Sequence, residues 1–338
     1  MSTLRHQTDV TVIGAGVVGL ATAVELAERG ARVTLIERSS ELGGNASWLA
    51  GGMLAPCCEG ESAPASVVER GAKAIDWWSR HAPGVVREGA LVIAPPRDVG
   101  EIDRFAARTR GHERVGEERI ATLEPDLAGR FARGLFFASE GHVDPRVALR
   151  ALCDELVARG ASLCFGVDGE TAPKRGAVID CRGFAARPDL PELRGVRGEM
   201  IRVRTREVKL TRTVRLLHPR IPLYVVPRQE GEYMIGATMI ESADTGGLSV
   251  RSAMELLSAA YTLHPAFGEA EILETSAGVR PAYPDNEPRI IETNGRIYLN
   301  GFYRHGFLLA PAFAAQAAEM VMSRWGADAV RADPYVAA

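Results

Sequence analysis

Three glycines near the N-terminus have a spacing that could bind a phosphate group. Residues 14–19 read Gly14-Ala15-Gly16-Val17-Val18-Gly19. Gly14 permits a tight turn, Gly16 lets a pyrophosphate approach the backbone, and Gly19 lets a helix pack closely on the preceding strand. The first N–H groups of a helix are free and carry partial positive charge. The pattern therefore predicts a dinucleotide-binding turn.

An acidic residue follows this turn at the distance expected for a ribose contact. Glu37 lies 23 positions after Gly14, at the end of the next apolar run. Its carboxylate can accept hydrogen bonds from both ribose hydroxyls of an adenosine, and it would repel a 2′-phosphate. We therefore expect the site to disfavour NADP. The motif alone does not distinguish FAD from NAD.

Two arginines near the C-terminus could bind an acid. Arg280 follows Val279 and precedes Pro281, at the end of an expected strand, and Arg304 lies in a loop between Gly301 and Gly306. A guanidinium offers two parallel N–H donors that match a carboxylate. By residue type alone, Arg280 could belong to a surface ion pair, and Arg304 could be a solvated loop arginine. Histidine is a common general base, but a histidine in a loop is usually exposed, so we do not assign His305 as a base.

The elements that position these residues begin with one βαβ unit. Residues 10–13 are a short β-branched run typical of a buried parallel strand. Apolar residues then recur at helical spacing from Val17 to Ala27, with Gly30 at the C-cap position. Residues 32–36 form the second strand. The glycine turn therefore connects the first strand to the helix.

Further along the chain, the pattern predicts more of this unit and a second sheet. Asp144 and Pro145 are typical of a helix start, and that helix runs to Gly160. Strands are expected at 162–165, 177–180 and 297–300, and an Ala-rich helix from about Pro311 to Arg324. The runs at 91–94, 200–204, 223–226 and 233–236 are typical of an antiparallel sheet.

These elements predict an α/β protein with two domains. A discontinuous Rossmann-like nucleotide-binding domain would comprise residues 1–85, 140–190 and 275–338. An antiparallel β-rich substrate domain, residues 86–139 and 191–274, would be inserted between its pieces. Such a split is consistent with a chain of 338 residues.

Composition excludes several classes of protein. The net charge of −3 argues against a bulk nucleic-acid binder, and no apolar stretch approaches the roughly 20 residues of a membrane span. The five scattered cysteines favour a reducing cytoplasm over a disulfide framework. Cys57 and Cys58 have no metal-ligand spacing, so we expect no metal site.

Longer segments resemble the D-amino-acid oxidase family of FAD proteins. They occur in the family's order and cover nearly the whole chain, and they are most similar to the bacterial glycine oxidases of thiamine biosynthesis. The resembling segments are residues 43–47, 50–56, 223–228, 235–238, 278–281, Asp285 with Pro288, and 301–311. Pro222 departs from the pattern, since some glycine oxidases have a polar residue there. The region around Tyr283 lacks the cysteine to which sarcosine oxidases attach flavin, so the resemblance implies non-covalent FAD.

The resemblance also implies site residues. Arg280 would bind the substrate carboxylate, assisted by the hydroxyl of Tyr224, with Arg304 and Met53 beside the substrate. The glycines near 301–306 would form a second backbone cradle for the flavin. The implied cofactor-binding residues are Gly14, Ala15, Gly16, Val17, Val18, Gly19, Glu37, Arg38, Asn45, Ala46, Ser47, Gly51, Gly52, Met53, Val167, Gly301, Tyr303, Arg304, His305, Gly306, Phe307 and Leu308.

The implied function is the FAD-dependent oxidative deamination of glycine and other small amines or D-amino acids. O2 would be reduced to H2O2, and the glycine imine would supply thiazole synthesis, with a thiazole synthase downstream. A sarcosine oxidase or a flavin-dependent D-amino-acid dehydrogenase of the same fold remains an alternative. So do a non-catalytic dinucleotide-binding protein and an NAD dehydrogenase. No nucleic-acid or membrane partner is expected, and homo-oligomerisation is left open.

Overall fold

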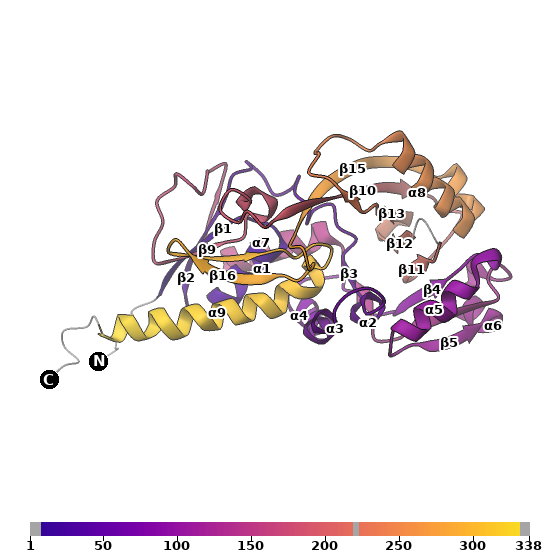
Figure 1. The fold of residues 1–338 in the computed structure, drawn as a ribbon, viewed down its shortest axis with the longest axis horizontal. Helices are drawn as coiled ribbons and strands as arrows, with labels where there is room; N and C mark the ends of the chain where they lie inside the picture. Colours follow the sequence, from indigo (N-terminus) through magenta and orange to yellow (C-terminus); the bar gives the residue numbers. More distant parts are fainter. Residues whose placement is uncertain (1–7, 219–222, 332–338) are drawn as a thin grey trace.

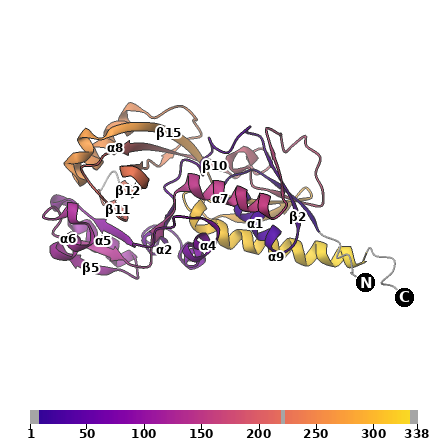
Figure 2. The same cartoon turned by 180° about the vertical axis from the view of Figure 1, so that it is seen from behind.

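The computed structural model describes residues 8–218 and 223–331, so Pro222 lies outside the described residues. The molecule is elongated, with one sheet and its helices at one end and a second sheet at the other (Figures 1 and 2). Helix α9 (Gly306–Arg331) lies at the end that carries the first sheet (Figure 1).

The first sheet has six strands in the order β16-β17-β9-β1-β2-β8. Five of them run parallel, and β16 is antiparallel to β17 at the edge. The strands are β1 (Asp9–Ile13), β2 (Arg32–Glu37), β8 (Ser162–Phe165), β9 (Ala177–Asp180), β16 (Arg289–Thr293) and β17 (Arg296–Asn300). The largest apolar core lies between this sheet and helices α1 (Val17–Glu28), α7 (Pro145–Ala158) and α9.

The second sheet has nine strands, eight of them in the order β14-β10-β13-β12-β11-β4-β6-β5. Strands β13 and β14 pair with different parts of one edge of β10, and β15 pairs with its other edge. Its pairs are antiparallel except for β4 and β11, which run parallel where the two inserted segments meet. The strands are β4 (Ala90–Ile93), β5 (Glu113–Gly116), β6 (Arg133–Phe137), β10 (Arg194–Arg204), β11 (Thr213–Leu216), β12 (Leu223–Pro227), β13 (Glu232–Gly236), β14 (Ile240–Glu241) and β15 (Glu271–Ala282). Helix α8 (Val250–Leu263) packs on this sheet.

Short elements connect the two sheets. They are β3 (Met53–Leu54), β7 (Gly141–His142), α2 (Pro56–Glu59), α3 (Ala65–Gly71) and α4 (Ala74–His81). Helices α5 (Gly100–Arg108) and α6 (Glu117–Leu123) instead join strands within the second sheet. The strands β3 and β7 pair with each other, and α2 and α3 lie between the two ends of the molecule (Figure 1). The predicted fold class, an α/β nucleotide-binding unit with a β-rich unit, is confirmed.

The last helix differs from its prediction because a proline was taken as its start. It begins at Gly306, so Pro311 lies inside it. Proline has no N–H, and the carbonyl of Phe307, four residues earlier, therefore has no partner within the helix. That carbonyl instead accepts a hydrogen bond of 2.7 Å from Nε1 of the buried Trp78. The tertiary contact thus replaces the hydrogen bond that the proline removes.

The predicted domain boundary at residue 275 does not follow the strand pairing. Strand β15 pairs with β10 along almost its entire length, from Arg204↔Glu271 to Arg194↔Ala282. Residues 275–282 therefore belong to the second sheet rather than to the first. The strand at 200–204 is likewise longer than predicted, because β15 supplies a partner for all of β10.

Within the described residues, one helix has the length and mean hydropathy of a membrane-spanning segment. It is the part of α9 at Gly306–Arg324. Helix α9 packs against α1, α3 and α4, and more than half of this part is buried. Its apolar character therefore matches that of a core helix.

Candidate active site

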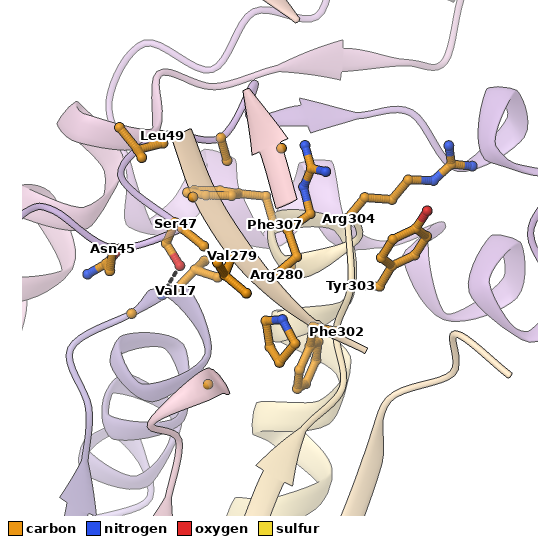
Figure 3. Close-up of a pocket in the computed structure, with 18 of the residues that line it drawn as sticks. Val17, Asn45, Ser47, Leu49, Val279, Arg280, Phe302, Tyr303, Arg304 and Phe307 are labelled. Atoms are coloured by element: carbon orange, nitrogen blue, oxygen red, sulfur yellow. Dashed lines mark hydrogen bonds between the residues drawn. The ribbon is translucent and has the colours of Figure 1, made fainter. Parts of the chain in front are cut away.

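A cavity of about 620 Å³ is lined by residues of both sheets and their connections. It extends from the turn after β1 to Arg280 on β15, past residues 43–55 and the segment before α9 (Figure 3). A volume of this size lies within the range of small-molecule sites. The lining residues come from distant parts of the chain, so the folding of both sheets is needed to form the site.

The glycine turn has the geometry that its spacing predicts. Gly14 has a φ of +102°, which is the conformation that favours glycine. A Cβ on Gly19 would lie 1.8 Å from the carbonyl oxygen of Gly14, so only glycine lets α1 approach the strand this closely. At Gly16, a Cβ would meet only the Oγ of Ser47, at 3.3 Å, and the backbone there faces the cavity.

Two helix N-termini meet at this end of the cavity. The Oγ of Ser47 accepts a hydrogen bond of 3.0 Å from the N–H of Val17, the first residue of α1 (Figure 3). Gly306, the first residue of α9, lies beside Val17, since a Cβ added to Gly306 would be 3.2 Å from Val17 Cγ1. Both helix starts line the cavity. Their partial positive charges would add for an anionic ligand.

Glu37 is fixed by backbone donors at the end of β2. Its carboxylate accepts a hydrogen bond of 2.7 Å from the N–H of Ala15 and one of 3.0 Å from the N–H of Ser39. A carboxylate has about four acceptor sites, so two remain for hydroxyl groups in the cavity. The N–H of Val167 donates to the backbone carbonyl of Glu37 at 3.0 Å, which places Val167 next to this residue.

Most of the residues predicted from the sequence are brought together here. Those lining the cavity are Gly14, Gly16, Val17, Val18, Glu37, Arg38, Asn45, Ala46, Ser47, Gly51, Gly52, Met53, Tyr224, Arg280, Tyr303, Arg304, His305, Gly306, Phe307 and Leu308. Ala15, Gly19, Val167 and Gly301 are not among the lining residues. At Gly301, with a φ of +83°, a Cβ would lie 2.2 Å from the ring of Tyr283, so this glycine is required for packing.

Arg280 lies against the backbone of Gly198, at the end of the cavity that the second sheet lines. A Cβ on Gly198 of β10 would lie 2.1–2.4 Å from three atoms of the Arg280 guanidinium. One N–H group of Arg280 donates to the Thr238 carbonyl at 3.0 Å, and its others have no acceptor among the described residues. The guanidinium is thus held in place with donors left for an acid. Burial raises the pKa of the Tyr224 hydroxyl, which keeps this cavity-lining group protonated.

Sequence reasoning missed a buried charge cluster at this end. Glu59 on α2 accepts from Arg215 on β11 at 2.8 Å, from Arg304 at 2.8 Å, and contacts Nε2 of His305 at 2.9 Å. Burial opposes ionisation of Glu59, but Arg304, Arg215 and His305 outweigh burial and hold its pKa well below the ordinary value. No motif marks Arg215 or Glu59. Only the meeting of β11, α2 and the segment before α9 identifies them.

The expectation that His305 is exposed is wrong. Its side chain is buried because Glu59 and the start of α9 cover it, and its Nδ1 has no partner among the described residues. Arg304, which could have been a solvated loop arginine, is fixed by Glu59 and by the Oγ of Ser62. Both side chains therefore belong to the cavity wall.

A buried carboxyl behind this cluster should make stability depend on pH. Glu140 accepts a hydrogen bond from the N–H of Cys58 at 2.7 Å, and burial raises its pKa from 4.5 to about 7. The native state therefore holds this proton between pH 4.5 and 7, where the unfolded chain releases it. The protonated Glu140 carboxyl therefore stabilises the native state fully below about pH 4.5, and this contribution is lost as the pH rises through 7.

We expect Glu140→Gln to remove this dependence, since glutamine cannot ionise and still accepts from Cys58. When the pH is raised from 5 to 8, the wild type should lose about 2 to 3 kcal/mol of unfolding free energy relative to the variant. Denaturant titrations at the two pH values measure this. A constant difference between the two proteins would contradict the prediction.

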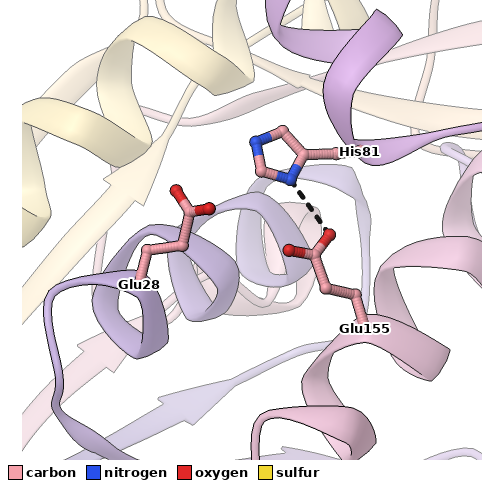
Figure 4. A group of neighbouring side chains, drawn as sticks. All are labelled: Glu28, His81 and Glu155. Atoms are coloured by element: carbon pink, nitrogen blue, oxygen red, sulfur yellow. Dashed lines mark hydrogen bonds and ion pairs between the residues drawn. The ribbon is translucent and has the colours of Figure 1, made fainter.

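A second group of ionisable side chains lies away from the cavity, between α1, α4 and α7. Glu28, His81 and Glu155 come close enough to hold a metal ion (Figure 4). However, Arg159 binds Glu28 and Glu155 at 2.8 Å each, and Glu155 also contacts Nδ1 of His81 at 3.0 Å. The carboxylates are thus already partnered, and the group is an ion-pair network that joins three helices.

The fold and this cavity define a class of protein, the dinucleotide-dependent oxidoreductases with a separate β-rich substrate unit. Residues 9–320 match the family described as FAD dependent oxidoreductase, and the chain belongs to this family. The predicted FAD-dependent enzyme is therefore confirmed, whereas the roles of individual site residues stay predictions.

Particular relatives refine this placement. The chain is 55% identical over 324 residues to the "Putative thiamine biosynthesis oxidoreductase ThiO" of Rhizobium etli, covering 96% of this chain and 99% of the relative. It is 28% identical to the glycine oxidase of Pseudomonas aeruginosa, covering 93% and 95%. Its fold is similar to that of the glycine oxidase from Bacillus cereus, with a TM-score of 0.79 at 24% identity and coverage of 94% and 96%. The predicted resemblance to glycine oxidases is confirmed.

The residues at the glycine turn fit FAD. The backbone at Gly16 is open to the cavity, two helix N-termini converge there, and Glu37 retains acceptor capacity. These features suit a pyrophosphate and a ribose, respectively. Since the same cavity continues to Arg280, an extended dinucleotide would approach this arginine.

Proposed function

We propose that this chain catalyses the FAD-dependent oxidative deamination of glycine and other small amines or D-amino acids. One observation supports this most directly: Arg280, with N–H groups left for an acid, lines the same cavity as the glycine turn. When bound, FAD supplies the acceptor for a hydride from the α-carbon and passes the electrons to O2, which becomes H2O2. The oxidised product is an imine, which supplies thiazole synthesis or hydrolyses to a 2-oxo acid and ammonia.

The chain's own residues bind and orient the substrate. Arg280 pairs with the carboxylate through parallel N–H groups, and the Tyr224 hydroxyl donates to the same carboxylate. This anchoring limits the positions open to the α-carbon, which lowers the entropic cost of reaction. Met53 and the glycines beside it cover the side of the cavity where the cofactor would lie. We propose non-covalent FAD, since the cysteine expected for covalent attachment is absent near Tyr283.

The cysteines and one relative support a proposal for the cellular setting. All five cysteines are free, as expected in the cytoplasm. One relative is the "Bifunctional protein ThiO/ThiG" of Nostoc sp. The match covers 94% of this chain and 53% of that relative. Since that relative has a second unit beyond the matched part, we propose a thiazole synthase as the downstream partner.

The function is tested with purified protein and a panel of glycine, sarcosine and D-amino acids. We expect H2O2 formation with glycine, and anaerobic bleaching of the flavin absorbance by the same substrate. Bleaching with slow recovery in air would instead indicate a dehydrogenase, and a preference for sarcosine would indicate a sarcosine oxidase. Bound FAD that no amine reduces would contradict any amine-oxidising function.

Gly198→Ala should weaken substrate binding through Arg280. The new methyl group would occupy the position of the guanidinium, which must move while β10 keeps its backbone conformation. We expect KM for glycine to rise about tenfold with little change in kcat, since tenfold corresponds to about 1.4 kcal/mol of lost binding. Gly116→Ala, in the same sheet with open space around it, is the control. If the effect persists unchanged in an Arg280→Ala background, it does not act through Arg280.

A further inference from the structure

The end of the cavity that would bind substrate carries an excess of positive charge. Arg215, Arg280 and Arg304 line it, and Glu59 is the one carboxylate there among the described residues. These four groups come from β11, β15, the segment before α9 and α2. Tyr224 lines the same cavity, and the charges of all four groups bear on the pKa of its hydroxyl.

The charge of Glu59 is fully engaged by its partners. One carboxylate oxygen pairs with Arg215 at 2.8 Å, and the other with Arg304 at 2.8 Å and His305 at 2.9 Å. A carboxylate held by two guanidinium groups is a poor base and a poor counter-ion for a third cation. Within this cluster Arg215 and Arg304 outnumber Glu59, and Arg280 adds one more charge. A bound carboxylate would balance only Arg280.

Among the remaining described titratable groups at this end, only Glu140 can carry a negative charge near neutrality. Tyr224 on β12 and Tyr303 before α9 are phenols, and His305 is neutral or positive. Cys57, Cys58 and Glu140 adjoin Glu59, and burial raises the pKa of each. Glu140, with a pKa of about 7, is the group whose own titration must be separated from that of the substrate.

We propose that the Arg215–Glu59–Arg304 cluster keeps the bound substrate amine in its neutral form. This inference rests on the proposed amino-acid oxidation, which it deepens. An ammonium ion would be repelled by the excess positive charge, and in a partly buried site this repulsion is stronger than in water. The neutral amine has the lone pair that forms the C=N bond as the hydride leaves, whereas an ammonium does not. The displaced proton passes to solvent. Arg215 thus acts as a positioning and electrostatic residue.

The test is the pH dependence of flavin reduction in the holoenzyme, measured anaerobically by stopped flow at saturating glycine. The limiting rate reports groups in the enzyme–substrate complex, so its acidic midpoint follows the bound amine. We expect Arg215→Gln to raise that midpoint by about one pH unit and Glu59→Gln to lower it by about one unit. Arg215→Lys, which keeps the charge, should restore the wild-type midpoint.

Opposite signs distinguish an electrostatic role from a structural one, since damage to the cavity would not move the midpoint in two directions. Arg212→Gln is the matched control, because Arg212 is buried and pairs with Glu124 at 2.9 Å without lining the cavity. It should leave the midpoint unchanged, as should Glu140→Gln. FAD content and Tm verify folding. If the glutamine variants do not fold, the midpoints of Arg215→Lys and Arg215→His, compared at high pH, replace those of the glutamine variants.

Unchanged midpoints in Arg215→Gln and Glu59→Gln, shifts of the same sign, or an equal shift in Arg212→Gln would overturn the inference. Failure of the proposed function has a different signature, because then wild-type FAD is not reduced by glycine, sarcosine or any D-amino acid at any pH. A midpoint that moves only with Glu140→Gln would assign the titration to that carboxyl and would also overturn the inference.

Discussion

Replacement of Arg280 by alanine should reduce kcat/KM for glycine by about 100- to 1,000-fold while the protein stays yellow. Removing one partner of a buried, hydrogen-bonded charge pair costs about 2 to 5 kcal/mol, and each 1.4 kcal/mol is tenfold. The cofactor should remain because Arg280 lies on β15 of the second sheet, whereas the glycine turn follows β1 of the first sheet. Steady-state kinetics with peroxide detection and the absorbance spectrum measure the two effects.

The control for this prediction is another arginine of the same region. Arg289→Ala removes ion pairs with Glu192 and Asp285 outside the cavity, so kcat/KM should stay near the wild-type value. If Arg280→Ala retains wild-type kcat/KM, the substrate carboxylate is bound elsewhere. Loss of the yellow colour in that variant would instead indicate that Arg280 supports the fold or the cofactor.

Gly19→Ala should yield protein that does not retain FAD. The added Cβ would lie 1.8 Å from the Gly14 carbonyl oxygen, and because that atom is backbone, α1 must move away from the turn. Such a movement displaces the helix N-terminus from the position where it would meet the pyrophosphate. We expect the dissociation constant for FAD to rise at least 100-fold, and stability to fall by about 1 to 3 kcal/mol from overpacking.

Flavin fluorescence titration of the apoprotein measures this affinity, and thermal unfolding measures stability. Gly100→Ala is the control, since Gly100 begins α5 with open space around it. That change should leave FAD binding unaltered and stabilise the helix slightly. Normal FAD affinity in Gly19→Ala would show that the close approach of helix and turn is not needed for binding.

The sequence by itself was sufficient for the nucleotide-binding end because its signals are local. A strand, a Gly14–Gly19 turn and a helix follow one another within a few residues, and the groups that we expect to bind phosphate are backbone N–H groups of that same segment. Glu37 could be assigned for the same reason, since it ends the next strand of one βαβ unit. The start of α9 was misplaced because Pro311 is tolerated only through the distant Trp78.

The substrate end was decided by tertiary structure. Arg280 was recognised from its neighbours in sequence, but that its guanidinium lies over Gly198 follows from the pairing of β10 with β15. Glu59 and Arg215 carry no local signal, and they become functional candidates only because α2 and β11 meet. Charges interact through space rather than along the chain, so the electrostatics of this cavity could not be read from residue spacing.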